Sequence, residues 1–401
     1  MQEKVVYLLG AGFSQPRGLP VMSNFIDKSK ELHRLNPQHY GYFADVFSKI
    51  ADIAIATKYF ETDLNNIEEI LSILEMSTQL ETQPGGESPS RYFRDYIAAV
   101  ISAYTPDIEP IPGIFMTSHW ESYIFGENDP IWKDYGQFVA SLHNLVIKSY
   151  RKGEGDPQFL WNFGSRRVAE PKTRYDVISL NYDLVLETVC NFLNNHYQGE
   201  EYPLRFQRTE SDKPATELGL PWLAKLHGSI DKLEDIIPPT WSKALTKKSI
   251  QEQWKTAHRL LSEADHIRIL GYSLPTSDTY VQYLLKSSVI RTERETFAPL
   301  KTFHVITLDS DGKTRDRYES LIKFRGFQFV DAPIEIYFRH IEPEEARRPE
   351  YKGPEEKRVL FTTLEDAHEG FMDLAERHNW KIPDSTSLPQ PAGRRVAILN
   401  P

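Results

Sequence analysis

Residues 4–14 read KVVYLLGAGFS and are the strongest local indication of the fold. They begin as a short β-branched and aliphatic run and end in small residues, which is typical of a buried parallel strand that enters a tight turn. Glycines at such a turn let a pyrophosphate approach the backbone, and the amides at the following helix N-terminus favour the anion. The dinucleotide fingerprint is incomplete here, because Gln15 stands at its third glycine position. Gly10, Ala11 and Gly12 therefore predict either a nucleotide-binding turn or a tight structural turn.

Apolar strands alternate with helical segments again after residue 170, where YDVISLN, LAKLHGS, HIRILGYS and FHVITLDS contain the expected strands. This alternation indicates βαβ units and a mostly parallel, doubly wound sheet. Before it, amphipathic segments such as DLNNIEEILSILEM (63–76) and WKDYGQFVASLHNLVIKSY (132–150) predict helices. The chain is therefore predicted to be an α/β protein. Its Rossmann-like parallel sheet is expected from residues 1–22 and 170–340, with a helical insertion domain over 23–169 and a C-terminal extension over 341–401.

Polar or small residues follow each later strand: Asn181 and Asp183 after YDVISL, His227 after LAKL, Gly271 and Ser273 after HIRIL, and Asp309 after FHVITL. Open α/β sheets bind ligands at the carboxyl ends of their parallel strands, so these residues are expected to share one pocket. His227 can exchange a proton near neutral pH, whereas Ser273 and Asp309 suit a phosphate or a ribose hydroxyl. Each has a structural alternative, because Asp183 and Asp309 are also typical helix caps and a single histidine is often structural.

The composition excludes several classes of site. The 401 residues include 47 basic and 57 acidic side chains, and the net charge of −10 opposes a polyanion, so we do not expect direct nucleic-acid binding. Cys190 is the single cysteine, which excludes a zinc site made of several thiolates. No apolar run approaches the roughly 20 residues that span a bilayer, and the first residues lack the basic region of a secretory signal. We expect a cytoplasmic protein with no membrane association and no metal site.

Four motifs in this order resemble the sirtuin-like proteins of bacterial antiphage defence systems: GAGFSQPRGLP (10–20), LNYDLVLE (180–187), KLHGS (225–229) and GYSLPTSD (271–278). The resemblance runs from the start of the chain to about Asp311 and implies that NAD binds on a Rossmann-like sheet. It implies that Asn181 and His227 form the catalytic pair and that Asp183 lies near the nicotinamide carboxamide. The residues implied to line the phosphate and ribose region of NAD are Gly10, Ala11, Gly12 and Ser14. Gly271 and Ser273 are implied to contact the phosphates, and Asp309 to lie near the adenosine ribose.

The sequence departs from the deacylating sirtuins in three places. The zinc module is absent, the first loop reads GLPVMSNF (18–25) in place of a GIPDFR type, and LNYD replaces QNID. The sirtuin-like defence proteins share these departures and are mostly NAD hydrolases. The resemblance therefore implies an NAD glycohydrolase, with NAD as substrate and no zinc, that depletes NAD as an abortive-infection effector. The alternatives are an NAD-dependent protein deacylase or ADP-ribosyltransferase, and a noncatalytic sensor of NAD or ADP-ribose.

The resemblance also implies partners. No GxxxxGK[ST] motif is present, so an ATPase would be a separate chain. The resemblance is greatest to effectors that form a homo-oligomer and pair with a HerA-type hexameric ATPase. In the C-terminal extension, Leu364, Ala367, Phe371 and Leu374 recur at helical spacing, and this stripe must be buried against its own domain or another subunit. We expect the extension to serve assembly or partner contact.

Overall fold

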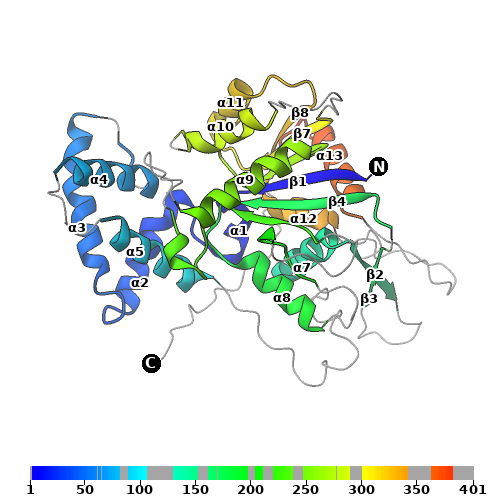
Figure 1. The fold of residues 1–401 in the computed structure, drawn as a ribbon, viewed down its shortest axis with the longest axis horizontal. Coiled ribbons are helices and arrows are strands. Elements are labelled where there is room, and N and C mark those ends of the chain that lie inside the picture. The colour runs from blue at the N-terminus through cyan, green and yellow to red at the C-terminus, as the bar shows by residue number, and fades with distance from the viewer. Residues whose placement is uncertain are drawn as a thin grey trace.

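A six-stranded sheet forms the centre of the protein (Figure 1). The computed structural model describes residues 2–60, 62–64, 66–81, 89–105, 130–151, 161–168, 170–196, 204–210, 220–237, 247–276, 278–289, 300–341 and 363–382. The strands are β1 (Glu3–Leu9), β4 (Thr173–Ser179), β5 (Leu223–Lys225), β6 (His266–Leu270), β7 (Thr302–Thr307) and β8 (Phe327–Asp331). Their order is β5-β4-β1-β6-β7-β8 and every pairing is parallel. This is the strand order of dinucleotide-binding sheets, so the predicted α/β fold with a Rossmann-like parallel sheet is confirmed.

Helices cover both faces of the sheet. The alternation of side chains along β1 explains why, since Val5, Tyr7 and Leu9 enter one hydrophobic core and Val6 and Leu8 enter the other. The first core is covered by α1 (Ala11–Ser14), α7 (Pro130–Leu142), α8 (Val185–His196), α12 (Ile334–Ile341) and α13 (Leu364–Arg377). The second is covered by α9 (Lys248–Glu263), α10 (Thr279–Ser288) and α11 (Lys313–Leu321). None of the helices in these described ranges is long and apolar enough to cross a membrane.

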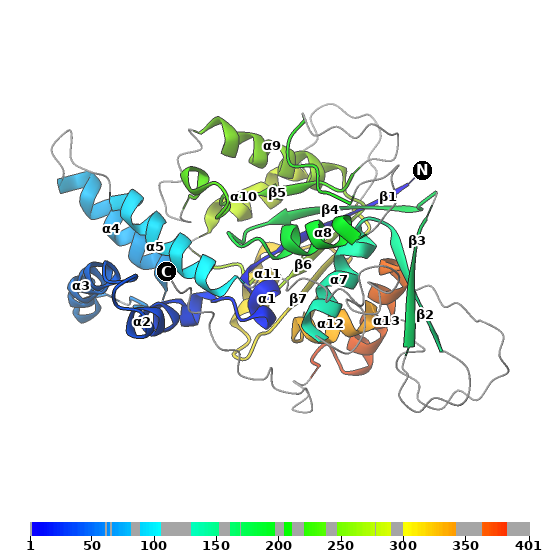
Figure 2. The same cartoon turned by 90° about the horizontal axis from the view of Figure 1, so that it is seen from below.

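Four helices form a block beyond the carboxyl ends of the strands, as Figures 1 and 2 show. They are α2 (Phe25–Leu35), α3 (Phe43–Ile53), α4 (Ile67–Glu81) and α5 (Pro89–Tyr104). Elsewhere in the described chain, and between these helices, there are four short 3-10 turns: η1 (Gln15–Arg17), η2 (Met22–Asn24), η3 (Ala54–Lys58) and η6 (Leu233–Asp235). Phe43 and Tyr96 pack edge to face with ring centroids 4.7 Å apart, and Ile26, Ile53 and Ile70 form a small core of their own. The block therefore faces the edge of the sheet to which the predicted site residues belong.

The helix predicted over residues 132–150 is wrong in its second half. Helix α7 ends at Leu142, Asn144 adopts a positive φ of 54°, and strand β2 (Leu145–Arg151) pairs antiparallel with β3 (Trp161–Arg167). Asparagine tolerates the left-handed conformation that ends a helix, and the β-branched residues that follow favour a strand. Helix α7 also packs against α8 and α12, so part of the predicted insertion covers the sheet.

Helix α13 is packed on its own domain. Leu364, Ala367 and Phe371 are buried in the first core, and Leu374 packs partly buried against it. After the helix, the chain runs beside β8, where the Asp331 amide donates to the Trp380 carbonyl at 2.9 Å. Of the two alternatives for the stripe, burial against its own domain is the one observed. The rest of the predicted extension, residues 342–362 and 383–401, lies outside the described residues, and its contact role stays a prediction.

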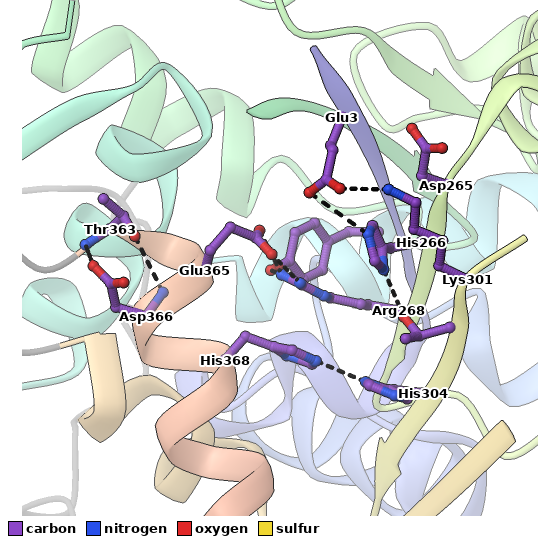
Figure 3. Close-up of polar contacts among 12 residues, drawn as sticks. Glu3, Asp265, His266, Arg268, Lys301, His304, Thr363, Glu365, Asp366 and His368 are labelled. Carbon is purple, nitrogen blue, oxygen red and sulfur yellow. Dashed lines mark hydrogen bonds and ion pairs between the residues drawn. The ribbon is translucent and has the colours of Figure 1, made fainter. Parts of the chain in front are cut away.

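A buried polar network ties α13 to the sheet (Figure 3). Arg268 of β6 forms an ion pair with Glu365 of α13 and donates to the Tyr7 hydroxyl at 2.8 Å. Beside it, His304 Nδ1 lies 2.7 Å from His368 Nε2. Burial, together with the nearby positive charge of Arg268, lowers the pKa of His304 to about 3. Burial likewise holds the pKa of His368 well below its usual range.

This histidine pair predicts a loss of stability in weak acid. Both rings are neutral when folded but take up protons near pH 6.5 when unfolded, so their contribution is present above about pH 6.5 and declines as the pH falls toward 3. When the pH falls from about 7.5 to 5, protonation of His304 in the unfolded state should by itself lower the free energy of unfolding by about 2 kcal/mol. Urea unfolding at both pH values should show a smaller loss for His304→Gln than for the wild type. The exposed His378→Gln control should behave as the wild type, and an equal loss in His304→Gln would contradict the assignment.

Candidate functional site

The site is built on a contact between two loops at the middle of the sheet. Strands β1 and β6 are neighbours, and the chain crosses from one side of the sheet to the other between them, which makes this the switch point where such sheets bind ligands. The Gly10 amide donates to the Leu270 carbonyl at 3.0 Å, and the Gly12 amide donates to the Gly271 carbonyl at 2.8 Å. The turn after β1 is therefore held directly against the turn after β6.

Glycine is required on both sides of this contact. A Cβ at Gly10 would lie 2.6 Å from the Gly271 carbonyl oxygen, and one at Gly12 would lie 2.9 Å from the same atom. Gly271 has a positive φ of 63°, and its Cβ would lie 2.2 Å from the Phe13 nitrogen. The tight structural turn, one of the two alternatives predicted from the sequence, is thus present. It leaves Ala11 exposed at the edge of the sheet. A turn of this kind can also receive a phosphate.

Asn181, which follows β4, links that strand to the turn after β1. Its Nδ2 atom donates to the Gly10 carbonyl at 2.9 Å and to the Ser14 hydroxyl at 3.2 Å. Both hydrogens of the amide are used in this way, so Oδ1 is the group of the side chain that can meet a ribose hydroxyl or a water molecule. Three of the predicted residues, from two strands, therefore lie together.

Asp183 has a structural role beside them. Its Oδ1 atom accepts from the Val185 amide at 3.0 Å, so it caps α8, and it also accepts from the Ser14 hydroxyl. Burial raises the pKa of Asp183, and the nearby Lys225 ammonium opposes that rise. Lys225 is itself buried, and its Nζ atom donates to the Asp183 carbonyl and to Glu187 Oε1. These contacts fix the loop that carries Asn181.

His227 follows β5 and is 4% exposed. Its Nε2 atom lies 3.7 Å from Oδ2 of Asp278, a carboxylate that is 1% exposed. The Tyr272 hydroxyl donates to the same oxygen at 2.9 Å. The amide of Ile230, three residues after His227, donates to the Tyr182 carbonyl at 2.9 Å, so the His227 loop is joined to the Asn181 loop. The two predicted catalytic residues therefore sit on connected loops at one edge.

Two further residues of this region were missed as site residues in the sequence. Asp278 ends the motif GYSLPTSD, but its relation to His227 depends on the path of the loop in space. Glu68, on α4 of the helical block, is buried. Burial raises the pKa of Tyr182 and of Tyr272, and the negative charge of Glu68 adds to the rise at both hydroxyls. The only sequence signal for Glu68 was its place in the run NIEEIL.

The remaining predicted residues lie on the flank of the site. Ser273 is exposed just after β6, where a ligand can reach its hydroxyl. Asp309 is buried after β7, and its two carboxylate oxygens each accept a backbone amide, from Thr314 and Arg315, at 3.0 Å. This is the capping alternative, here for α11. A ribose would have to share these oxygens, each of which has a second lone pair.

Other chemistry is weakly represented in the described residues. Cys190 is buried in α8, and burial raises the pKa of its thiol, which disfavours the nucleophilic thiolate. No group of three or more His, Cys, Asp or Glu side chains within the described ranges could hold a metal ion. A small cavity of about 20 Å³, lined in part by Lys4, Arg174 and Asp176, lies at the opposite, amino end of the sheet.

Comparison with known proteins finds one family model and several solved structures that are similar to this chain. Residues 176–349 match the SIR2-like domain. Among solved structures, a Sir2 in complex with the inhibitor EX-527, 2'-O-acetyl-ADP-ribose and a deacetylated p53 peptide is 12% identical, with 86% of this chain and 94% of that chain covered and a TM-score of 0.29. A Sir2 with a p53 peptide and NAD+ gives the same values. A structure concerned with sirtuin substrate affinity is 12% identical over 85% of this chain and 93% of that chain, with a TM-score of 0.33. No curated protein gives a significant match.

The tight contact of Gly271 with the turn after β1 can be tested by comparison with Gly312, and both glycines lie within the SIR2-like match. Gly312 also has a positive φ, of 78°, but a Cβ there would meet no atom within 4 Å. Gly312→Ala should cost about 1 kcal/mol of unfolding free energy from backbone strain alone. Gly271→Ala should cost roughly 2–4 kcal/mol, because the methyl group also pushes the two turns apart. Urea unfolding measures both, and equal losses would show that the contact between the turns is not tight.

Proposed function

We propose that this protein hydrolyses NAD at the bond between nicotinamide and ribose, releasing nicotinamide and ADP-ribose. The observation that carries the proposal is the position of Asn181 and His227, on connected loops beside a glycine turn at the switch point of a sheet with the dinucleotide-binding strand order. The match of residues 176–349 to the SIR2-like domain supports the choice of NAD. The substrate fits the donor set, since backbone amides suit phosphates and amide, hydroxyl and imidazole groups suit ribose and water.

The chemistry needs little from the protein beyond position and one base. When the C–N bond breaks, its electron pair stays on the nicotinamide nitrogen and the ribose develops oxocarbenium character. A water molecule then forms the new bond to the ribose carbon, and its proton is transferred to His227. Asn181 Oδ1 orients a ribose hydroxyl or that water, and the turns after β1 and β6 hold the phosphates.

The alternatives differ in what receives the ribose. A deacylase or ADP-ribosyltransferase uses the same bond cleavage but requires an acyl-lysine or protein acceptor. A noncatalytic sensor binds NAD or ADP-ribose without turnover. Incubation of the purified protein with NAD, with and without an acylated peptide, separates all three when nicotinamide, ADP-ribose and modified peptide are quantified.

Substitution of the two central residues tests the assignment. His227→Ala removes the base and should lower NAD turnover by about 10²- to 10⁴-fold. Asn181→Ala should lower it as well, and it should also reduce stability because the Gly10 carbonyl and the Ser14 hydroxyl each lose one hydrogen bond. The exposed His378→Ala is the matched control and should keep full activity. Either site variant that is folded and fully active would overturn its assigned role.

We further propose that the chain is a cytoplasmic antiphage effector, which kills an infected cell by NAD depletion, and that it works as a homo-oligomer with a HerA-type ATPase. The support is the resemblance of its motifs to sirtuin-like defence proteins. Such an activity is harmful to its own host, so control by assembly with a sensor chain is expected.

Light-scattering mass measurement tests the assembly. The protein should form a species several times its 46.4 kDa chain mass, and a larger one with a HerA-type ATPase. A single 46.4 kDa species in both cases would contradict the oligomer and the partner.

A further inference from the structure

We propose that Asp278 is a positioning residue that orients His227 and stabilises its protonated form during the reaction, an inference that rests on the proposed NAD hydrolysis. Asp278 is 1% exposed, and its Oδ2 atom lies 3.7 Å from His227 Nε2. The two residues are 51 positions apart in the chain, on the loops that follow β5 and β6.

The carboxylate of Asp278 is not used as a helix cap, although it occupies the cap position. Asp278 directly precedes α10, yet its side chain makes no capping hydrogen bond. Asp183 and Asp309, at the same edge of the sheet, both accept backbone amides at the starts of their helices. Of these three aspartates, Asp278 alone directs its carboxylate to Tyr272 and His227.

A second side chain holds this carboxylate in place. The Tyr272 hydroxyl donates to Asp278 Oδ2 at 2.9 Å, and the Tyr272 carbonyl accepts from the Tyr318 hydroxyl at 2.9 Å. Burial, aided by the negative charge of Asp278, raises the pKa of Tyr272 well above its usual range, so its hydroxyl keeps the proton that it donates. A buried carboxylate is costly unless charges or hydrogen bonds compensate it. Tyr272 supplies a hydrogen bond, and His227 supplies a positive charge when it is protonated.

The geometry gives Asp278 two effects on the reaction. Before the reaction, the negative charge of Asp278 favours the tautomer in which His227 carries its proton on Nε2, the nitrogen nearest the carboxylate. The other nitrogen, Nδ1, then has the lone pair that accepts the proton of the attacking water. After the transfer, the imidazolium lies beside a negative charge. Asp278 takes no proton itself, as in other acid–histidine pairs. It acts on the reaction through His227.

Asp278→Asn tests the inference because it keeps the size of the side chain and removes its charge. We expect kcat for NAD hydrolysis to fall by about 10- to 100-fold with little change in KM, since residues that orient a catalytic group commonly have effects of this size. Tyr272→Phe should give a smaller fall in kcat. Asp265→Asn, the same change at the amino end of β6, is the matched control and should keep wild-type kcat. A folded Asp278→Asn protein with wild-type kcat would overturn the proposal.

A readout without turnover separates this inference from the proposed function. Nitrogen-15 NMR of the imidazole rings, with His227→Ala used to assign the His227 signals, reports which nitrogen carries the proton. The wild type should show the Nε2–H form, and Asp278→Asn should show a mixture of both tautomers. If the wild type lacks NAD turnover, the proposed function fails, while the NMR result still decides whether Asp278 positions His227. Unchanged His227 signals in Asp278→Asn would overturn the positioning role, and Tyr272→Phe supplies the same test if Asp278→Asn does not fold.

Discussion

The contact between Gly12 and Gly271 is the constraint on which the site depends. Their backbones meet through a hydrogen bond of 2.8 Å between the turns that follow β1 and β6. These two strands are neighbours at the point where the strand order of the sheet reverses. No side chain larger than hydrogen fits at this point. The turn after β1 is consequently fixed relative to β6, and Asn181 binds that turn from β4. Loops from strands that are distant in sequence thus become one rigid edge.

Along this edge, acidic residues that look alike in sequence have different roles. Asp183 and Asp309 satisfy backbone amides at helix starts, which stabilises the fold. Asp278 stands at a helix start as well, but its carboxylate faces His227. Because a carboxylate can accept a backbone amide or lie beside an imidazole ring, the path of each loop decides which contact a given aspartate makes.

The sheet was predictable from local patterns, whereas several contacts of the site were not. A continuous apolar run such as Val5 to Leu9 predicts a buried parallel strand, and parallel strands bring their carboxyl ends together. The pairing of β2 with β3 was missed because the 132–150 segment has helical spacing. After Asn144 the antiparallel pairing with β3 overrides that spacing. The docking of α13 was undecided because Arg268 and Glu365 are 97 residues apart. Asp278 and Glu68 were missed for the same reason, since their neighbours are set by tertiary structure.

A crystal structure of the His227→Ala variant with NAD would show whether NAD binds at the carboxyl edge of the sheet. The phosphates of NAD should lie at the turns after β1 and β6, and the nicotinamide ribose should lie within hydrogen-bond distance of Asn181 Oδ1. Binding of NAD elsewhere on the protein would contradict this placement. An unliganded edge at saturating NAD would contradict it equally.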